Sequence, residues 1–217
     1  MTSHGETADR LYIDLLLEQL SIQSDKAVLR YRCADITGDA LRSAIFRYAR
    51  ALGSLGIGKG SLVALLAPNC PDALAIRYAA SVLGAATTFL PALRNVGDQG
   101  VLVARIRPTL LVVFAETAHL VRAGVPERVV FVGMGVESSR LDKLAQAHSR
   151  EPLPIGAMPD DLAVIVSSGG TTDVPKFSRR SFAIYSAMAK AERAEDKRQL
   201  INGPLAYISQ VLVDSTL

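Results

Sequence analysis

The sequence has 217 residues, of which 49% are hydrophobic and 21% are charged, and its formal net charge at pH 7 is +3. This apolar content is enough for a buried core, which excludes an intrinsically disordered chain. Basic residues are scattered rather than clustered, so we expect no nucleic acid as a partner.

We expect neither a targeting segment nor a membrane-spanning helix in this sequence. The first apolar run, 11–20, is interrupted by Asp14 and Glu18, and no later stretch is long enough to cross a bilayer. The two cysteines, Cys33 and Cys70, lie far apart in ordinary apolar segments, which predicts neither a disulfide framework nor a metal site. The expected compartment is the cytoplasm.

In chain order, the first predicted element is an amphipathic helix over 11–20, where leucines recur at three- and four-residue steps. A strand at 28–32 follows. Thr37 is then the predicted N-cap of a helix whose apolar face runs to Leu55. The remaining predicted elements are strands at 62–67, 87–90, 110–114, 129–132 and 163–166, and helices at 71–83, 98–106 and 141–148.

Short apolar strands that alternate with helices predict an α/β fold: a mainly parallel sheet in three αβα layers, with helices on both faces. Pro71 suits the first turn of its helix, and Gly84 suits its end. The proline-containing stretch 151–159 is the expected surface connection, and the charged run 192–198 is expected to be a solvated helix face.

Candidate chemistry is concentrated in the segment 164–182, which reads VIVSSGGTTDVPKFSRRSF. Glycines allow close approach of the backbone to a ligand, hydroxyl and amide groups donate to phosphate oxygens, and a lysine neutralises phosphate charge. Such a loop can also be a simple connection between a strand and a helix. It is not of the Walker type, because the GxxxxGK[ST] spacing is absent. The residues of this predicted phosphate loop are Ser167, Ser168, Gly169, Gly170, Thr171, Thr172 and Lys176.

The order of residues 168–176, SGGTTDVPK, resembles the phosphate-loop signature of the adenylate-forming superfamily, which comprises acyl-CoA synthetases, aryl-acid AMP ligases and nonribosomal adenylation domains. The stretches 52–69 and 84–93 are similar to upstream parts of that family. Gly203 to Tyr207, reading GPLAY, resembles its Pro-Leu-x-His step. The Ser-Gly-Gly start of the loop is most similar to the aryl-acid branch.

This resemblance implies ATP and Mg²⁺ as cofactors, an aryl or fatty acid as substrate, and a CoA or carrier-protein thiol as acceptor. By the same resemblance Lys176 is the expected catalytic residue, since it would neutralise the departing pyrophosphate, and Tyr207 would stand at the wall of the acid pocket. No protein ligand for a metal is assigned. Tyr207 could equally be a half-buried aromatic residue with its hydroxyl at the surface.

Two residues depart from the family pattern: Asp173 stands where the family has glycine, and Tyr207 where it has histidine. The sequence also lacks a match to the family's adenine- and ribose-binding steps and to its C-terminal domain. Residues 1–217 are therefore expected to be part of an N-terminal AMP-binding domain that is inactive alone and self-associates or needs a complementing polypeptide. The alternatives are a non-catalytic binding or scaffolding module with the same fold and, more distantly, a Rossmann-type oxidoreductase, which would require a GxGxxG motif that is absent.

Overall fold

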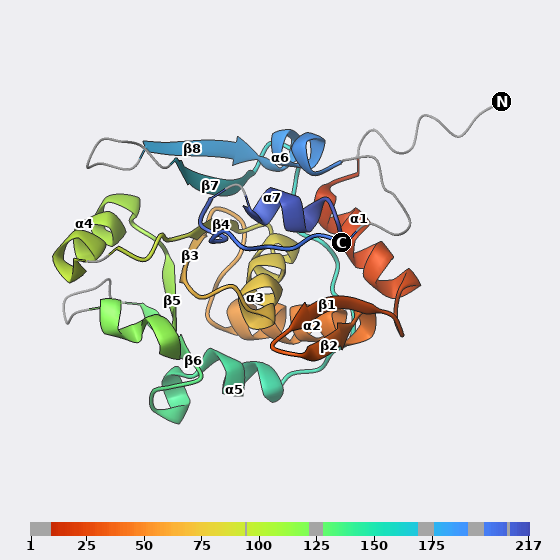
Figure 1. Cartoon of the computed structure of the whole chain (residues 1–217), viewed down its shortest axis with the longest axis horizontal. Coiled ribbons are helices and arrows are strands. Elements are labelled where there is room, and N and C mark those ends of the chain that lie inside the picture. The colour runs from red at the N-terminus through yellow and green to blue at the C-terminus, as the bar shows by residue number, and fades with distance from the viewer. Residues whose placement is uncertain (1–9, 94, 122–127, 169–175, 191–197, 208) are drawn as a thin grey trace.

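A six-stranded sheet forms the centre of the protein, in a computed structural model that describes residues 10–93, 95–121, 128–168, 176–190, 198–207 and 209–217 (Figure 1). Of Ser168 and Lys176 only the backbone is described. The strand order is β6-β5-β3-β4-β7-β8, parallel throughout except for β8, which pairs antiparallel with β7 at the edge. The strands are β3 (Leu62–Leu66), β4 (Ala86–Phe89), β5 (Leu110–Phe114), β6 (Val129–Val132), β7 (Leu162–Ser168) and β8 (Lys176–Ser181).

Two apolar layers sandwich this sheet, which confirms the predicted three-layer architecture. Val63 and Leu65 point into the larger layer, whereas Ala64 and Leu66, on the opposite face, point into the smaller one. The smaller layer is closed by α4 (Val96–Ile106) and the 3₁₀ turn η1 (Ala115–Leu120), near the short turn η2 (Glu137–Ser139). The larger layer is closed by α1 (Tyr12–Ile22), α2 (Gly38–Ser54), α3 (Pro71–Val82), α5 (Leu141–Gln146), α6 (Phe182–Ala189) and α7 (Ser209–Asp214). No helix within the described part of the chain is long and apolar enough to span a membrane.

Two predicted helix boundaries are confirmed: the start of α2 and the end of α3. The Thr37 side chain accepts a hydrogen bond of 3.2 Å from the Ala40 amide and so caps α2. Gly84, at φ +72°, follows the end of α3, and a Cβ there would come within 2.7 Å of the Gly156 carbonyl oxygen. Gly156 in turn donates its N–H to the Val82 carbonyl at 2.7 Å. The stretch 151–159, predicted as a surface connection, is mostly exposed but packs against the end of α3 at this point.

Two strands were not predicted from the sequence. The first is β2 (Ala34–Thr37), which forms an antiparallel hairpin with β1 (Ala27–Tyr31). Its turn residues, Arg32 and Cys33, have φ values of +47° and +64°, a conformation that Asn or Gly usually adopts, so no residue type indicated this turn. The second is β8, which continues from the predicted phosphate loop where only a helix from about residue 181 was expected.

A buried polar network holds α7 against the larger layer. The Arg77 guanidinium forms two hydrogen bonds of 2.7 Å to the Asp214 carboxylate, and both side chains are 0% exposed. The hydroxyls of Tyr78 and Tyr185 each donate to that carboxylate at 2.6 Å. Burial raises the pKa of both tyrosines well above its ordinary value. Burial is the largest single effect on the Arg77 pKa and lowers it, but the Asp214 carboxylate and the neighbouring tyrosines together raise this pKa well above its ordinary value. The network therefore combines a neutral tyrosine pair with a buried ion pair, in which Arg77 Nε has no hydrogen-bond partner.

Candidate functional site

The predicted phosphate loop connects β7 to β8 at the carboxyl edge of the sheet, where ligands bind in open α/β proteins. Ser168 ends β7 and pairs directly with Lys176, the first residue of β8. The antiparallel pairing therefore brings the two flanks of the predicted loop together. Gly169, Gly170, Thr171, Thr172 and Asp173 lie outside the described residues.

Ser167 lies directly before Ser168 in β7 and forms a hydrogen bond to a distant segment of the chain. Its side chain is 2% exposed, and its hydroxyl donates a hydrogen bond of 3.1 Å to the carbonyl oxygen of Ala206. This carbonyl belongs to the stretch Gly203 to Tyr207, in which sequence analysis placed the wall of the acid pocket. The structure thus brings the predicted phosphate loop and the predicted pocket wall to the same edge of the sheet.

Asn69 joins the same segment from the opposite side. Its side-chain nitrogen donates to the Gly203 carbonyl at 2.8 Å, and its side-chain oxygen accepts from the Leu205 amide at 3.1 Å. Asn69 follows β3, whereas Ser167 belongs to β7, and β4 lies between these strands. The segment therefore crosses the carboxyl end of β4.

Tyr207 is the half-buried end of this segment. Leu205 and Ala206 are each 4% exposed and anchor the segment in the core, while Tyr207 packs against the core only in part. The Tyr207 amide donates to the Pro204 carbonyl at 3.3 Å, and the side-chain amide of Gln210 donates to the Tyr207 carbonyl at 3.4 Å. The backbone at Tyr207 is thus held by a tight turn and by the start of α7.

The switch point of the sheet, between β3 and β5, is occupied by a protein group. The hydroxyl of Thr117 donates to the Leu66 carbonyl at 2.6 Å and to the Phe114 carbonyl at 3.1 Å. Connections leave β3 and β5 in opposite directions, which usually opens a ligand crevice between them. Because Thr117 is 8% exposed and already bonded, this point is closed by the chain itself.

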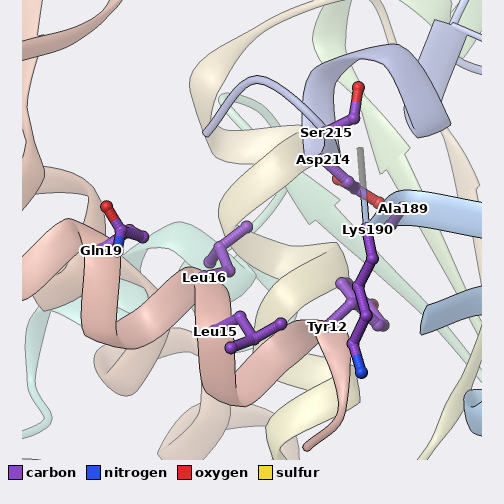
Figure 2. Close-up of a pocket in the computed structure, with 8 residues that line it drawn as sticks. All are labelled: Tyr12, Leu15, Leu16, Gln19, Ala189, Lys190, Asp214 and Ser215. Carbon is purple, nitrogen blue, oxygen red and sulfur yellow. The ribbon is translucent and has the colours of Figure 1, made fainter. Parts of the chain in front are cut away.

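Two hollows are found in the described surface. One, of about 220 Å³, is bordered by α1, the end of α6 and the end of α7, with Asp214 and Tyr12 on its wall (Figure 2). It adjoins the buried Arg77 network, and its residues are Tyr12, Leu15, Leu16, Gln19, Ala189, Lys190, Asp214 and Ser215. The other, of about 480 Å³, lies between α2 and α5. Neither of them contains a residue of the predicted site.

Two other features bear on chemistry. Among the described residues, no group of three or more His, Cys, Asp or Glu side chains could hold a metal ion. Both cysteines are free thiols. Burial raises the pKa of the Cys70 thiol to about 11, so this thiol stays protonated and unreactive near neutral pH.

Asn69 was not predicted as a functional residue, because the stretch Pro68 to Pro71 indicated only a turn. The bonds from Asn69 to Gly203 and Leu205 join residues about 135 positions apart, which no local pattern indicates. An amide side chain held between two prolines at the carboxyl end of a buried strand was the available signal.

Comparisons with known proteins agree with this arrangement. Residues 16–213 match the family of AMP-binding enzymes. The chain is 31% identical over 161 residues to Protein Y of Streptomyces griseus, covering 67% of this chain and 52% of that protein. It is 27% identical over 168 residues to 2-succinylbenzoate–CoA ligase of Oceanobacillus iheyensis, covering 75% of this chain and 33% of the ligase.

A solved structure shows the same fold. The N-terminal subdomain of Klebsiella oxytoca NpsA, in complex with 3-hydroxybenzoyl-AMSN, superposes with a TM-score of 0.79 at 17% identity, over 99% of this chain and 53% of that one. The chain thus spans about half or less of the proteins it resembles. Enzymes of this family use ATP and join carboxylic acids to thiols. The chain belongs to the AMP-binding family of adenylate-forming enzymes and corresponds to the N-terminal part of such an enzyme.

Proposed function

We propose that this chain carries the ATP-phosphate site of a carboxylate–AMP ligase, at the carboxyl edge of its sheet. The observation that carries the proposal is the pairing of Ser168 with Lys176, which brings the two ends of the SGGTTDVPK segment together. In this proposal the phosphates are held by the backbone amides and hydroxyls of Ser168, Gly169, Gly170, Thr171 and Thr172. Ser167 closes the base of the site.

Lys176 is proposed to neutralise charge on the departing pyrophosphate, the role in which a fixed cation contributes most to such a reaction. ATP fits the donor set, since hydroxyls, glycine amides and one lysine are the groups that bind a polyphosphate. ATP would bring Mg²⁺ with it; within the described residues, the protein offers no cluster of carboxylates for that ion.

Tyr207 is proposed to form part of the wall for the acid. We propose an aryl acid as the substrate class, which the Ser-Gly-Gly loop start and two relatives support: one relative is named for 2-succinylbenzoate, and the other was solved with a 3-hydroxybenzoyl ligand. The acceptor would be the thiol of CoA or of a carrier protein.

We further propose that residues 1–217 form part of an N-terminal domain and do not complete adenylation alone. No segment of the sequence matches the family's adenine- and ribose-binding steps, so another polypeptide segment would have to bind the adenosine. The proposed compartment is the cytoplasm. This proposal predicts little or no carboxylate-dependent exchange of pyrophosphate into ATP by the purified chain. Robust exchange would contradict it.

The melting temperature of the purified chain with and without MgATP tests the binding claim. ATP at a hundred times its Kd should stabilise the protein by about 2.7 kcal/mol. Lys176→Ala should abolish this stabilisation. Lys59→Ala is the matched control: Lys59 is an exposed lysine, 3.0 Å from Asp161, at the amino edge of the same sheet. It should retain the full ATP effect.

A non-catalytic module with the same fold is the competing function, and the departures at Asp173 and Tyr207 favour it. It predicts no ATP-induced shift in the wild type or in either variant. An equal ATP-induced rise in melting temperature in the wild type and in Lys176→Ala would show that ATP binds outside the loop. This result would contradict the proposal.

A further inference from the structure

The carboxamide of Asn69 forms a two-point contact with the backbone of another segment. Its nitrogen donates to the Gly203 carbonyl and its oxygen accepts from the Leu205 amide, at 2.8 and 3.1 Å. Both polar atoms of the side chain are therefore used. This contact, which we call the Asn69 clasp, pairs the side chain with a peptide backbone as a neighbouring strand would.

The local sequence explains why an asparagine is needed. Pro204 separates the two clasped residues and has no N–H group, so Leu205 carries the first amide donor after the Gly203 carbonyl. Only a terminal carboxamide presents a donor and an acceptor side by side at that reach. An aspartate could accept from Leu205 but could not donate to Gly203.

The turn that presents Asn69 is rigid. Proline stands on each side of the Asn69–Cys70 dipeptide, and Cys70 has the extended backbone (φ −147°) that a following proline favours. The Cys70 carbonyl also accepts a hydrogen bond from Leu74 in α3. Asn69 therefore lies in a short turn between a buried strand, β3, and a buried helix, α3.

On the far side of the clasped segment, Ser167, the first residue of the predicted phosphate loop, donates a hydrogen bond to the Ala206 carbonyl. Asn69 and Ser167 together fix Gly203 to Ala206 at two points, immediately before Tyr207. We propose that Asn69 is a positioning residue of the ATP site: it holds the Gly203–Tyr207 segment against the base of the phosphate loop. This inference rests on the proposed function.

Amide hydrogen exchange on the whole 217-residue chain tests the clasp without any ligand. In Asn69→Ala the Leu205 amide should exchange about five to ten times faster, because one hydrogen bond is lost. Asn69→Asp keeps the acceptor for Leu205 and should preserve the protection of that amide. Unchanged exchange of Leu205 in Asn69→Ala would overturn the inference.

Asn95→Ala is the matched control. Asn95 caps α4 by accepting from the Gly97 amide at 2.8 Å, so its loss affects stability without touching the clasped segment. Exchange of Leu205 should be unchanged in this variant. Equal acceleration in both variants would mean general loosening of the fold and would overturn the positioning role.

The second readout is the ATP-induced rise in melting temperature. Asn69→Ala should weaken ATP binding about tenfold or more, Asn69→Asp should also weaken it because the Gly203 bond is lost, and Asn95→Ala should not. If Asn69→Ala accelerates Leu205 exchange but binds ATP like the wild type, the clasp does not position the site and the inference fails. If the wild type shows no ATP effect, the proposed function fails, and with it the positioning role.

Discussion

The C-terminal part of the chain is attached to the rest of the protein in two ways that differ in chemistry. At α7, Asp214 forms an ion pair with Arg77 and accepts hydrogen bonds from two tyrosine hydroxyls. The side chains of this ion pair have no exposure to solvent. At the Gly203–Tyr207 segment, Asn69 and Ser167 form neutral hydrogen bonds to backbone atoms at the edge of the sheet. The first attachment fixes the position of a helix, whereas the second shapes a surface loop. Stability and ligand binding should therefore be separable by mutation.

The largest effect is expected when the buried ion pair is broken. Asp214→Asn keeps the size of the side chain but leaves the Arg77 guanidinium buried without a counter-charge. Breaking a buried pair in this way costs about 3–5 kcal/mol of unfolding free energy. Urea denaturation followed by circular dichroism measures this loss.

Replacement of both partners sharpens this result. Arg77→Met combined with Asp214→Asn removes both charges and keeps an acceptor for the two tyrosine hydroxyls, so it should lose less stability than Asp214→Asn alone, because no unpaired charge is left behind. A double variant that is less stable than the single one would show that the ion pair itself, and not the avoided unpaired charge, stabilises α7.

A smaller effect is expected at the sheet edge. Asn69→Ala and Ser167→Ala each remove neutral hydrogen bonds and should lower the unfolding free energy by about 1 kcal/mol each. The same urea titrations measure both. A loss as large as that of Asp214→Asn would erase the distinction between an attachment that holds the fold and one that shapes the site.

The Cys70 thiol reports on the turn that carries Asn69. Because its pKa is raised to about 11, only about one thiol in a thousand is ionised at pH 8. In a Cys33→Ser background, alkylation by iodoacetamide should therefore accelerate about tenfold for each unit between pH 8 and pH 10. A rate that levels off below pH 10 would mean that the turn is more open than the structure shows.

The smallest effect, of opposite sign, is expected at the β1–β2 hairpin, which contains no residue of either attachment. Replacement of Arg32 by Asn and of Cys33 by Gly suits the positive φ values of the turn and should stabilise the protein by about 0.5–1 kcal/mol. Thermal denaturation of the double variant measures the gain. A loss of stability would mean that the two native side chains make contacts that outweigh backbone strain.

The parts of this architecture that were predictable are those encoded by nearby residues. The buried strands, the Thr37 cap and the Gly84 terminus follow from local hydrophobic patterns and local backbone preferences. The phosphate loop was predicted from the order of residues 168–176 and stays a prediction.

The long-range contacts that attach the C-terminal part of the chain were not predictable, because local sequence patterns do not encode them. Arg77 and Asp214 are 137 residues apart, and Asn69 is 134 residues from Gly203, so only the folded chain brings them together. The pairing of β8 was missed because Arg179 and Arg180 interrupt any apolar alternation in that strand.

The most direct test of the central claim is hydrogen exchange of the whole chain with and without MgATP, analysed by mass spectrometry. Binding at the carboxyl edge predicts that peptides covering 164–180 and 203–207 become protected, while the β1–β2 hairpin and α4 do not. Protection confined to other regions, or no protection at saturating ATP, would contradict the placement of an ATP-phosphate site at this edge of the sheet.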